Sequence, residues 1–237
     1  MARAPTQDKE VAELTTPLGT DVLSIVRFDG SEGLSELFEY TIEAVGDKKP
    51  LDFNKAIGEN CTISLVGKTA TRDYCGVLVQ ADWVGQPDSN NLYRLVLRPW
   101  FWLLGRTSDC RIFHNKTTPD IIQEVCRDRG FNDFSLKLTE SYPTREYTVQ
   151  YRETDLDFVS RLMEEDGIYY FFEHSQGKHI LVLADAKSSH KSISGLDKVL
   201  YIDRLVSGRS DQECFYEMTA SRSFHTGKIA HNAYDYS

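Results

Sequence analysis

Acidic side chains gather near residue 160 of this 237-residue chain, where carboxylates could hold a metal ion or act as an acid and base. Glu164, Glu165 and Asp166 are consecutive, and Asp155 and Asp157 lie just upstream. Such chemistry needs carboxylates that converge on one atom. Side chains of consecutive helical residues point in different directions, so we interpret the run as a solvated helix face. A carboxylate enzyme using Asp155, Asp157 or Glu164 is the less favoured alternative.

The histidines do not form a metal-binding pattern. They lie at positions 114, 174, 179, 190, 225 and 231, without an HExxH or HxH arrangement. His174 and His179 flank a predicted hairpin turn and could approach each other, but zinc sites need at least a third protein ligand. We therefore predict no metal-ligating residues.

Other catalytic and cofactor-binding motifs are also missing from the sequence. No GxSxG elbow accompanies a Ser, His and Asp set, and the glycines match neither a dinucleotide fingerprint nor a phosphate loop. We predict no catalytic residue and no cofactor. The five cysteines have no paired spacing, which favours reduced, buried thiols over disulfides or zinc ligands. They are Cys61, Cys75, Cys110, Cys126 and Cys214.

Composition is that of an ordinary globular protein and disfavours two classes of partner. Hydrophobic residues make up 41% of the chain, and 27 Lys and Arg face 36 Asp and Glu, for a net charge of -9. That balance disfavours nucleic acid and anionic membranes as ligands. No run approaches the roughly 18 apolar residues of a membrane span. Residues 1–20 contain no apolar segment of the kind found in secretory signal peptides, so we expect export by another route.

The elements that must position these side chains begin with strands. Residues 1–20 lack periodicity, and we predict a flexible leader there, with the fold beginning near Asp21. Five strand-length runs rich in β-branched and aromatic residues follow, separated by polar turns. They cover residues 22–28, 37–45, 61–66, 74–83 and 92–97. Alternation, which is clearest in Phe38, Tyr40, Ile42 and Ala44, indicates a sheet with one buried face, as in a small antiparallel barrel or sandwich.

After Arg98 the hydrophobic period changes to that of helices. Thr118 is predicted to cap a short amphipathic helix that ends before Gly130. A second helix is predicted over 155–166, with Thr154 and Asp157 resembling a capping box. A hairpin of 168–173 and 179–183 should cover its apolar face, giving an α+β unit. Further strands are predicted at 198–206, 213–221 and 229–236.

The aromatic run Trp100, Phe101 and Trp102 lies where the strand pattern gives way to the helix pattern. Exposed tryptophans can be binding hot spots. Because leucines and a proline flank the run, we favour a structural junction between the two parts, and keep an interface as the alternative.

Three segments resemble the VgrG family, the trimeric hub and spike of the bacterial type VI secretion system. They are LFEYTIEAV at 37–45, RPWFWLLGRTSDCRIFHNKTTPDIIQEV at 98–125 and SYPTREYTVQYRETDLDFVSRLMEEDGIYYFFEH at 141–174. The resemblance runs in order from about residue 22 to the last residue. It implies a mainly β fold with an α+β insert: a tube-type β-barrel at 21–105, an α+β segment at 106–205 and the start of a second, incomplete barrel at 206–237.

The resemblance also implies a non-enzymatic, mechanical role. The expected partners are two further copies in a homotrimer, the Hcp tube, and effectors or adaptors carried by the spike. The expected location is the bacterial cytoplasm before firing, followed by secretion through the type VI system. The OB-fold and β-helix of that family have no counterpart in these 237 residues, so a hub fragment or the product of a truncated gene is expected. A stand-alone binding module is the alternative function.

Overall fold

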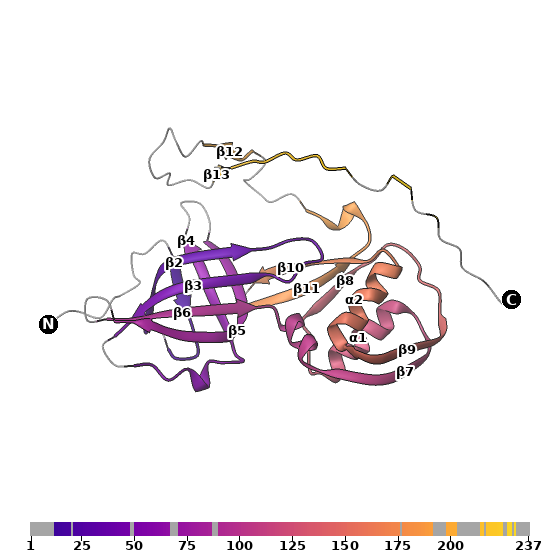
Figure 1. Ribbon diagram of the computed structural model, residues 1–237, viewed down its shortest axis with the longest axis horizontal. Helices are drawn as coiled ribbons and strands as arrows, with labels where there is room; N and C mark the ends of the chain where they lie inside the picture. Colours follow the sequence, from indigo (N-terminus) through magenta and orange to yellow (C-terminus); the bar gives the residue numbers. More distant parts are fainter. Residues whose placement is uncertain are drawn as a thin grey trace. The chain divides into compact units, whose positions relative to one another are not determined.

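The computed structural model describes residues 12–19, 21–47, 50–66, 71–86, 90–175, 177–191, 198–202, 214–215, 217–224, 227–228 and 230. The chain divides into two compact units, Met1–His190 and Lys191–Ser237. The first unit contains a curled antiparallel sheet and a second part in which two helices lie between two smaller sheets (Figure 1). Within the described ranges, no helix is long and apolar enough to cross a bilayer.

Six strands build the curled sheet, which confirms the predicted mainly β fold. Their order is β1-β4-β5-β6-β3-β2, and every neighbouring pair is antiparallel. The strands are β1 Ala12–Thr15, β2 Leu23–Ser31, β3 Glu39–Gly46, β4 Asn60–Val66, β5 Thr71–Gly85 and β6 Asn91–Arg98. A short 3-10 helix, η1 Phe53–Lys55, precedes β4. Strands two to six match the five predicted runs.

The sheet starts earlier than predicted. β1 lies inside the segment that we expected to be a flexible leader, and it pairs with β4 from Ala12 opposite Leu65 to Thr15 opposite Thr62. Leu14 is buried in the core of the sheet. One buried leucine and a four-residue strand give too short a periodic signal to separate from a loop.

Alternate side chains of β3 point into the core of the curled sheet. Tyr40, Ile42 and Ala44 are fully buried, together with Phe38 just before the strand, while the intervening residues are only partly buried. This is the pattern predicted for residues 37–45, because successive side chains of a strand point to opposite faces.

The helices α1 Thr118–Asp128 and α2 Asp155–Glu165 occur where the sequence predicted them. The cap of α1 was wrong by one residue: the N-cap is Thr117, whose hydroxyl accepts from the N–H of Asp120 in a capping box. Thr154 caps α2 as predicted, accepting from the N–H of Asp157 at 3.0 Å. Gly130 and Gly167 follow the helices at positive φ, a conformation that suits glycine.

The predicted hairpin is present and belongs to a three-stranded sheet. β10 Tyr169–Ser175 pairs with β11 Lys178–Ala184, and β11 pairs on its other side with β8 Phe134–Lys137, in parallel. The short 3-10 helix η4 Lys187–Ser189 follows. The sequence pattern did not predict β8.

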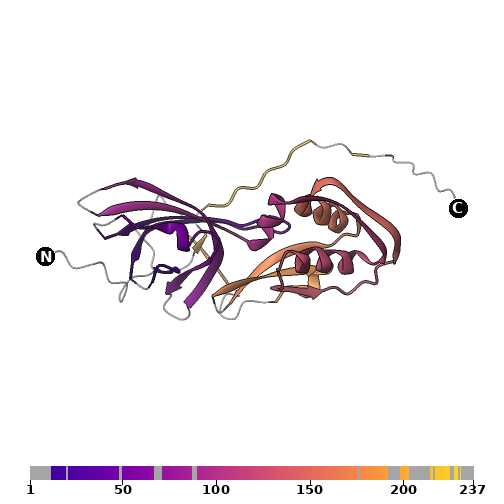
Figure 2. The same cartoon turned by 90° about the horizontal axis from the view of Figure 1, so that it is seen from below.

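A second small sheet was missed altogether. β7 Ser108–Lys116 pairs with β9 Arg145–Thr154 in a long antiparallel ribbon. Helices α1 and α2 lie between this ribbon and the three-stranded sheet (Figures 1 and 2). The 3-10 helix η3 Trp100–Arg106 connects β6 to the ribbon.

Two buried clusters form the core of the first unit, and the hairpin joins them. One lies within the curled sheet and the other among η3, the helices and the three-stranded sheet. Phe172 of β10 packs against both clusters. The hairpin therefore holds the curled sheet to the helical part.

In the second unit, β12 Leu200–Tyr201 pairs in parallel with β13 Cys214–Phe215. These short strands lie within the segments predicted at 198–206 and 213–221. The strand predicted at 229–236 lies almost entirely outside the described residues.

Candidate functional site

An aromatic cluster containing His174 lies where the hairpin meets the curled sheet. The ring of His174 is 5.3 Å from that of Phe38 and 5.9 Å from that of Tyr40, measured between centroids. Its Nδ1 accepts a hydrogen bond of 3.0 Å from the main-chain N–H of Cys75, and its Nε2 lies 3.1 Å from the hydroxyl of Tyr40. Tyr40 also donates to the carboxylate of Glu32.

His179 belongs to the same aromatic cluster. It is paired with His174 across the hairpin, and the two ring centroids are 6.2 Å apart, as expected for residues flanking the turn. Its Nε2 accepts a hydrogen bond of 2.8 Å from the main-chain N–H of Trp100. Both histidines thus act as acceptors for main-chain donors of the neighbouring elements, which identifies them as structural residues.

Burial keeps these groups uncharged. It lowers the pKa of His179 to about 3, with a smaller contribution from neighbouring His174. Burial also lowers the pKa of His174, against the opposing charge of Glu32. Burial and the hydrogen bond to Glu32 raise the pKa of Tyr40. Within the described ranges, no group of three or more His, Cys, Asp or Glu could hold a metal ion.

Asp155 does not lie on a solvated face, which corrects the sequence interpretation. Its side chain is 0% exposed. It accepts hydrogen bonds from Arg129 at 2.6 Å, Arg111 at 2.7 Å, Gln150 at 2.7 Å and Thr107 at 3.0 Å. Burial disfavours the charge, but these donors outweigh it and hold the pKa of Asp155 below its ordinary value. The carboxylate joins α2 to the ribbon and to the end of α1.

The other predicted carboxylates do not converge with it. Asp157 and Glu164 are exposed, as expected for a solvated face. Asp155 and Glu164 lie at opposite ends of α2, roughly 13 Å apart along the axis at about 1.5 Å per residue. The paired carboxylates of glycoside hydrolases, for example, lie closer than that, at roughly 5 to 9.5 Å. Among the described residues, Asp155 and Glu164 therefore do not form a carboxylate pair of that kind.

The aromatic run at the start of η3 is a junction, as predicted. Trp100 and Phe101 are buried in the helical core cluster, which also includes Val77 of the curled sheet. Trp102 is partly exposed, and the guanidinium carbons of Arg106 and Arg98 lie 3.9 Å and 5.2 Å from the centroid of its ring.

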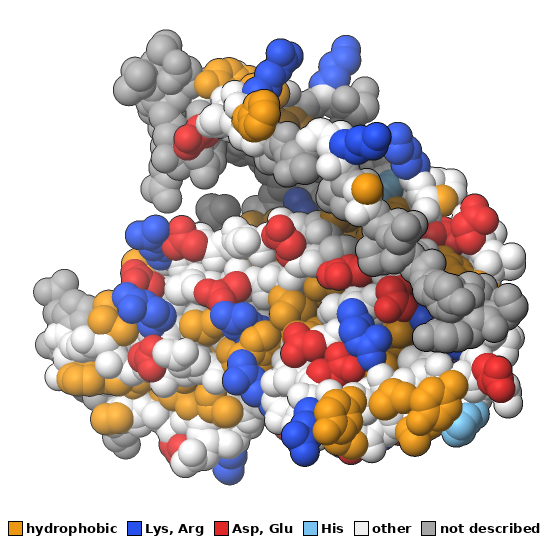
Figure 3. All heavy atoms as spheres, turned by 45° about the vertical axis from the view of Figure 1, so that its right-hand side comes forward, with side chains coloured by type: hydrophobic (Ala, Val, Ile, Leu, Met, Phe, Trp, Pro, Cys, Tyr) orange, Lys and Arg blue, Asp and Glu red, His pale blue; other side chains and the backbone are white. Residues whose placement is uncertain are grey.

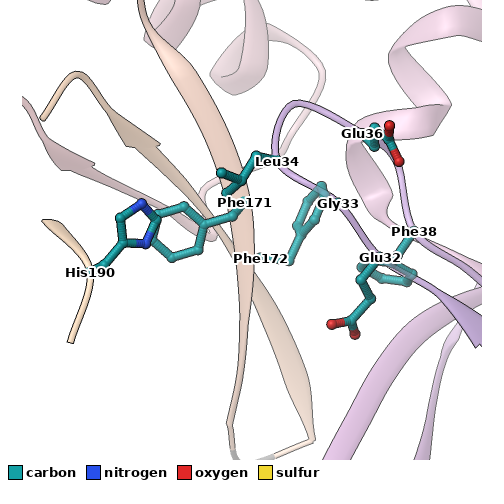
Figure 4. Close-up of a pocket in the computed structure, with 8 residues that line it drawn as sticks. All are labelled: Glu32, Gly33, Leu34, Glu36, Phe38, Phe171, Phe172 and His190. Carbon is teal, nitrogen blue, oxygen red and sulfur yellow. The ribbon is translucent and has the colours of Figure 1, made fainter. Parts of the chain in front are cut away.

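A pocket of about 290 Å³ lies between the loop after β2 and strand β10. Leu34, Phe171 and Phe172 supply its apolar lining, and Glu32 and Glu36 are its acidic residues. Figure 4 shows Phe171 and Phe172 on opposite sides of β10, with the two glutamates pointing apart. The loop is fixed to β10 by a hydrogen bond of 2.8 Å from Ser35 N to the carbonyl oxygen of Tyr170. The pocket can hold an apolar side chain but brings no catalytic pair together.

An exposed apolar face covers the ribbon of β7 and β9. Tyr151, Tyr147 and Ile112 are 64%, 57% and 54% exposed. Cys110 stands opposite Tyr151, and His114 opposite Tyr147. Figure 3 shows hydrophobic side chains next to histidine atoms at the lower right, where Figure 1 places these strands. Exposed apolar patches of this kind are typical of protein contact surfaces.

The cysteines only partly follow the prediction. Cys61, Cys75 and Cys126 are buried free thiols, but Cys110 is exposed and Cys214 is half-buried. Burial raises the pKa of Cys61 and of Cys126 to about 12.

Sequence reasoning missed the structural role of Asp155, although a signal was present. Asp155 shares one face of α2 with Phe158, Val159 and Leu162, which are buried. An acid on the apolar face of a helix must be buried with partners.

Comparison with known proteins agrees with this architecture. Residues 31–237 match the phage tail baseplate hub (GPD) family. The chain is 40% identical over 231 residues to the type VI secretion system spike protein VgrG1b of Pseudomonas aeruginosa, covering 97% of this chain. It spans only 31% of that relative's length.

Two of the similar solved structures illustrate the likeness. One is the c3393 protein of E. coli, described as a component of the type VI secretion system, with a TM-score of 0.69 and 26% identity over 81% of this chain and 52% of that one. The other is a tail protein of Neisseria meningitidis MC58, with a TM-score of 0.58 over 82% of this chain and 56% of that one. At 15% identity, the second shows likeness of fold alone. The expected resemblance to VgrG is confirmed, and the chain belongs to the phage tail baseplate hub family.

Proposed function

We propose that the chain is a structural hub component of a type VI secretion puncturing device, linking the Hcp tube to the spike and thereby delivering effectors. The observation that carries this proposal is the 40% identity to a spike protein along 97% of the chain. The candidate catalytic residues support a non-enzymatic role, because Asp155 is fully engaged by its four donors and Glu164 is remote from it.

The proposed mechanism is mechanical. A hub must transmit mechanical load without unfolding. Three features stiffen the first unit. They are the hydrogen bond from the N–H of Trp100 to His179, the hydrogen bond from the N–H of Cys75 to His174, and the ion pairs of Asp155 with Arg111 and Arg129. We propose that three copies form the platform. The apolar face of the β7–β9 ribbon is the surface we assign to protein contacts in that assembly.

The domain division inferred from the sequence stands as part of this proposal. It comprises a first barrel at 21–105, extended upstream by β1, an α+β segment at 106–205 and the beginning of a second barrel at 206–237. The proposed location is the bacterial cytoplasm before firing and the exterior afterwards.

A chimera tests the proposal. This chain replaces the aligned 231 residues of P. aeruginosa VgrG1b, and Hcp is measured in the medium of a strain that lacks its other VgrG proteins. We expect Hcp secretion at the level of the native spike protein. The same chimera carrying Asp157→Asn and Glu164→Gln should secrete equally well. A chimera that is made at full length, is folded, and releases no Hcp contradicts the proposal.

A stand-alone binding module is the second candidate, favoured by the pocket beside Leu34 and Phe171. The molar mass of the purified chain, measured by light scattering after size exclusion, distinguishes the hub from the binding module. A trimer of the 27.1 kDa chain supports a platform, whereas a monomer that holds a ligand in this pocket supports the module.

A further inference from the structure

The pocket between the loop after β2 and strand β10 combines an apolar wall with two acidic residues. Leu34 is 59% exposed, and the ring centroids of Phe171 and His190 are 5.3 Å apart. Figure 4 shows Leu34 extending from the loop toward β10, with the ring of Phe171 beside that of His190. Glu32 and Glu36 also line the pocket, and none of its described lining residues is a lysine or an arginine. The pocket therefore offers both negative charge and apolar surface.

Glu36 has no counter-charge among the described residues. It is exposed, and its carboxylate forms no hydrogen bond or ion pair with any of them. Lys137 and Arg72 are not part of the lining, and both have partners of their own. Nζ of Lys137 lies 2.5 Å from the carboxylate of Glu173, and the guanidinium carbon of Arg72 lies 5.0 Å from the ring centroid of Tyr74. Glu36 therefore contributes an unpaired negative charge at the pocket.

Glu32 is held by a chain of hydrogen bonds that begins in the core. Because the main-chain N–H of Cys75 donates to Nδ1 of His174, the proton of the neutral ring is on Nε2, which donates to the hydroxyl oxygen of Tyr40. The single proton of that hydroxyl is then donated to Oε1 of Glu32. Tyr40 is 0% exposed, whereas the side chain of Glu32 is 42% exposed. A buried donor thus orients a carboxylate that remains accessible from outside.

The loop that carries both acids has an uncommon backbone conformation. Ser35 has a φ of 56°, and its main-chain N–H donates to the carbonyl oxygen of Tyr170 at 2.8 Å. A residue other than glycine in this left-handed region costs roughly 1–3 kcal/mol and persists only where its surroundings hold it. A Cβ at Gly33 would lie 2.5 Å from Oε2 of Glu36, so the glycine leaves room for that carboxylate. The loop therefore holds its acids in a fixed arrangement beside β10.

We propose that this pocket binds an arginine side chain of a partner polypeptide. The methylene groups of the arginine pack against Leu34 and Phe171, and the guanidinium pairs with Glu36 and is further attracted by Glu32. A guanidinium suits this lining because it is weakly hydrated and can pair with a carboxylate as well as pack on an aromatic ring. Two carboxylates repel an anion, and a purely apolar side chain leaves Glu36 unpaired. At about 290 Å³ the pocket is just below the roughly 300–1,000 Å³ of small-molecule sites, which suits one long side chain. The inference concerns the ligand of this pocket and holds for a hub as well as for a binding module.

Titration of the ¹⁵N-labelled full chain with blocked amino acids tests the inference. The probe is Nα-acetylarginine N-methylamide. The citrulline derivative has the same shape without the charge, and the glutamate derivative represents an anion. The main-chain signals of Leu34 and Phe171 are the readout, and that of Cys126 in α1 is the reference. We expect saturable shifts at Leu34 and Phe171 with the arginine derivative and none at Cys126. The citrulline derivative should bind about three- to tenfold more weakly, as expected for partly exposed ion pairs.

A matched pair of variants locates the bound charge. Glu36→Gln removes the unpaired carboxylate and should reduce the preference for arginine over citrulline at least about twofold. Glu146→Gln is the same substitution at an exposed position of β9 and should leave the preference unchanged. In the double variant Glu32→Gln/Glu36→Gln the two derivatives should bind equally. The single variant decides the matter even where the double variant fails to fold.

Four results overturn the proposal. An absence of saturable shifts at Leu34 and Phe171 indicates that the pocket holds only water. Equal binding of the arginine and citrulline derivatives to the unaltered chain indicates a purely apolar pocket. Tighter binding of the glutamate derivative indicates an anion site. A preference that Glu36→Gln and Glu146→Gln change equally indicates a cation bound elsewhere. Failure of this titration and failure of the chimera to release Hcp are separate results, because neither experiment measures the other property.

Discussion

Nδ1 of His174 accepts the main-chain N–H of Cys75 at 3.0 Å, across 99 residues of sequence. A histidine that accepts a main-chain N–H through one nitrogen cannot protonate that nitrogen without breaking the bond. With the matching bond from Trp100 to His179, the hairpin is held to its neighbours by two contacts that require neutral imidazoles.

Acidification should therefore weaken the fold before the carboxylates titrate. Burial lowers the pKa of His179 from 6.5 to about 3, so below pH 6.5 the unfolded chain takes up a proton that the folded chain does not. Stability is then lost as the pH falls. Between pH 7 and pH 5.5 this one histidine should cost about 1 kcal/mol, measured as the free energy of unfolding in urea.

The variant His179→Gln serves as the control for that measurement. Its side-chain oxygen can accept from Trp100 but does not titrate in this range. The loss between pH 7 and pH 5.5 should shrink by about 1 kcal/mol in the variant. Parallel loss in both proteins would falsify the assignment of the pH dependence to His179.

Replacing Asp155 should be far more damaging than replacing the other acids of α2. Asp155→Asn leaves Arg111 and Arg129 without their buried carboxylate and should lower the free energy of unfolding by about 3 to 5 kcal/mol. Glu164→Gln, at an exposed position of the same helix, should change it by less than about 0.5 kcal/mol. Urea denaturation of the two variants gives the comparison. Similar losses in both would mean that Asp155 is not the residue that joins α2 to the ribbon.

The cysteines should divide into two kinetic classes. The exposed thiol of Cys110 and the half-buried thiol of Cys214 should react quickly with Ellman's reagent. Cys61, Cys75 and Cys126 are buried with raised pKa values and should react only after denaturation. Mass spectrometry of alkylated peptides assigns the classes. Rapid labelling of Cys126 in the folded chain would contradict the packing of α1.

Gly76 should not tolerate a side chain. A methyl group there would lie 2.9 Å from Cβ of Leu97 and 3.1 Å from the ring of Phe38. Gly76→Ala should therefore cost about 1 to 3 kcal/mol through overpacking. Gly105→Ala is the matched control, since its methyl group would meet Leu156 at an ordinary 3.4 Å. Thermal melts of both variants distinguish them, and an equal melting temperature would exclude the close approach at Gly76.

The sequence predicted those helices and strands whose hydrophobic pattern is complete within one short segment. Alternation through Tyr40 and Ile42 predicted β3, and the spacing of apolar residues predicted α1 and α2. The ribbon escaped prediction because its outer face carries Ile112, Tyr147 and Tyr151, so that apolar residues occur on both faces and the alternation is lost.

The contacts that define the candidate sites depend on tertiary pairing. Asp155 meets Arg129 from 26 residues away, and Trp100 meets His179 from 79 residues away. Both separations are longer than the stretch of roughly 11 to 18 residues over which hydrophobic periodicity is read, so no local pattern includes both members of a pair.

The position of the hairpin late in the chain also sets an order of events during translation. Tyr40 and His174 are 134 residues apart, so the ribosome needs roughly 7 to 30 s to add the second after the first at about 5–20 residues per second. During that interval the aromatic side of the newly made sheet faces the cytosol without its covering strand. We expect the nascent chain to depend on chaperones that hold exposed aromatic surfaces until residue 184 has left the exit tunnel.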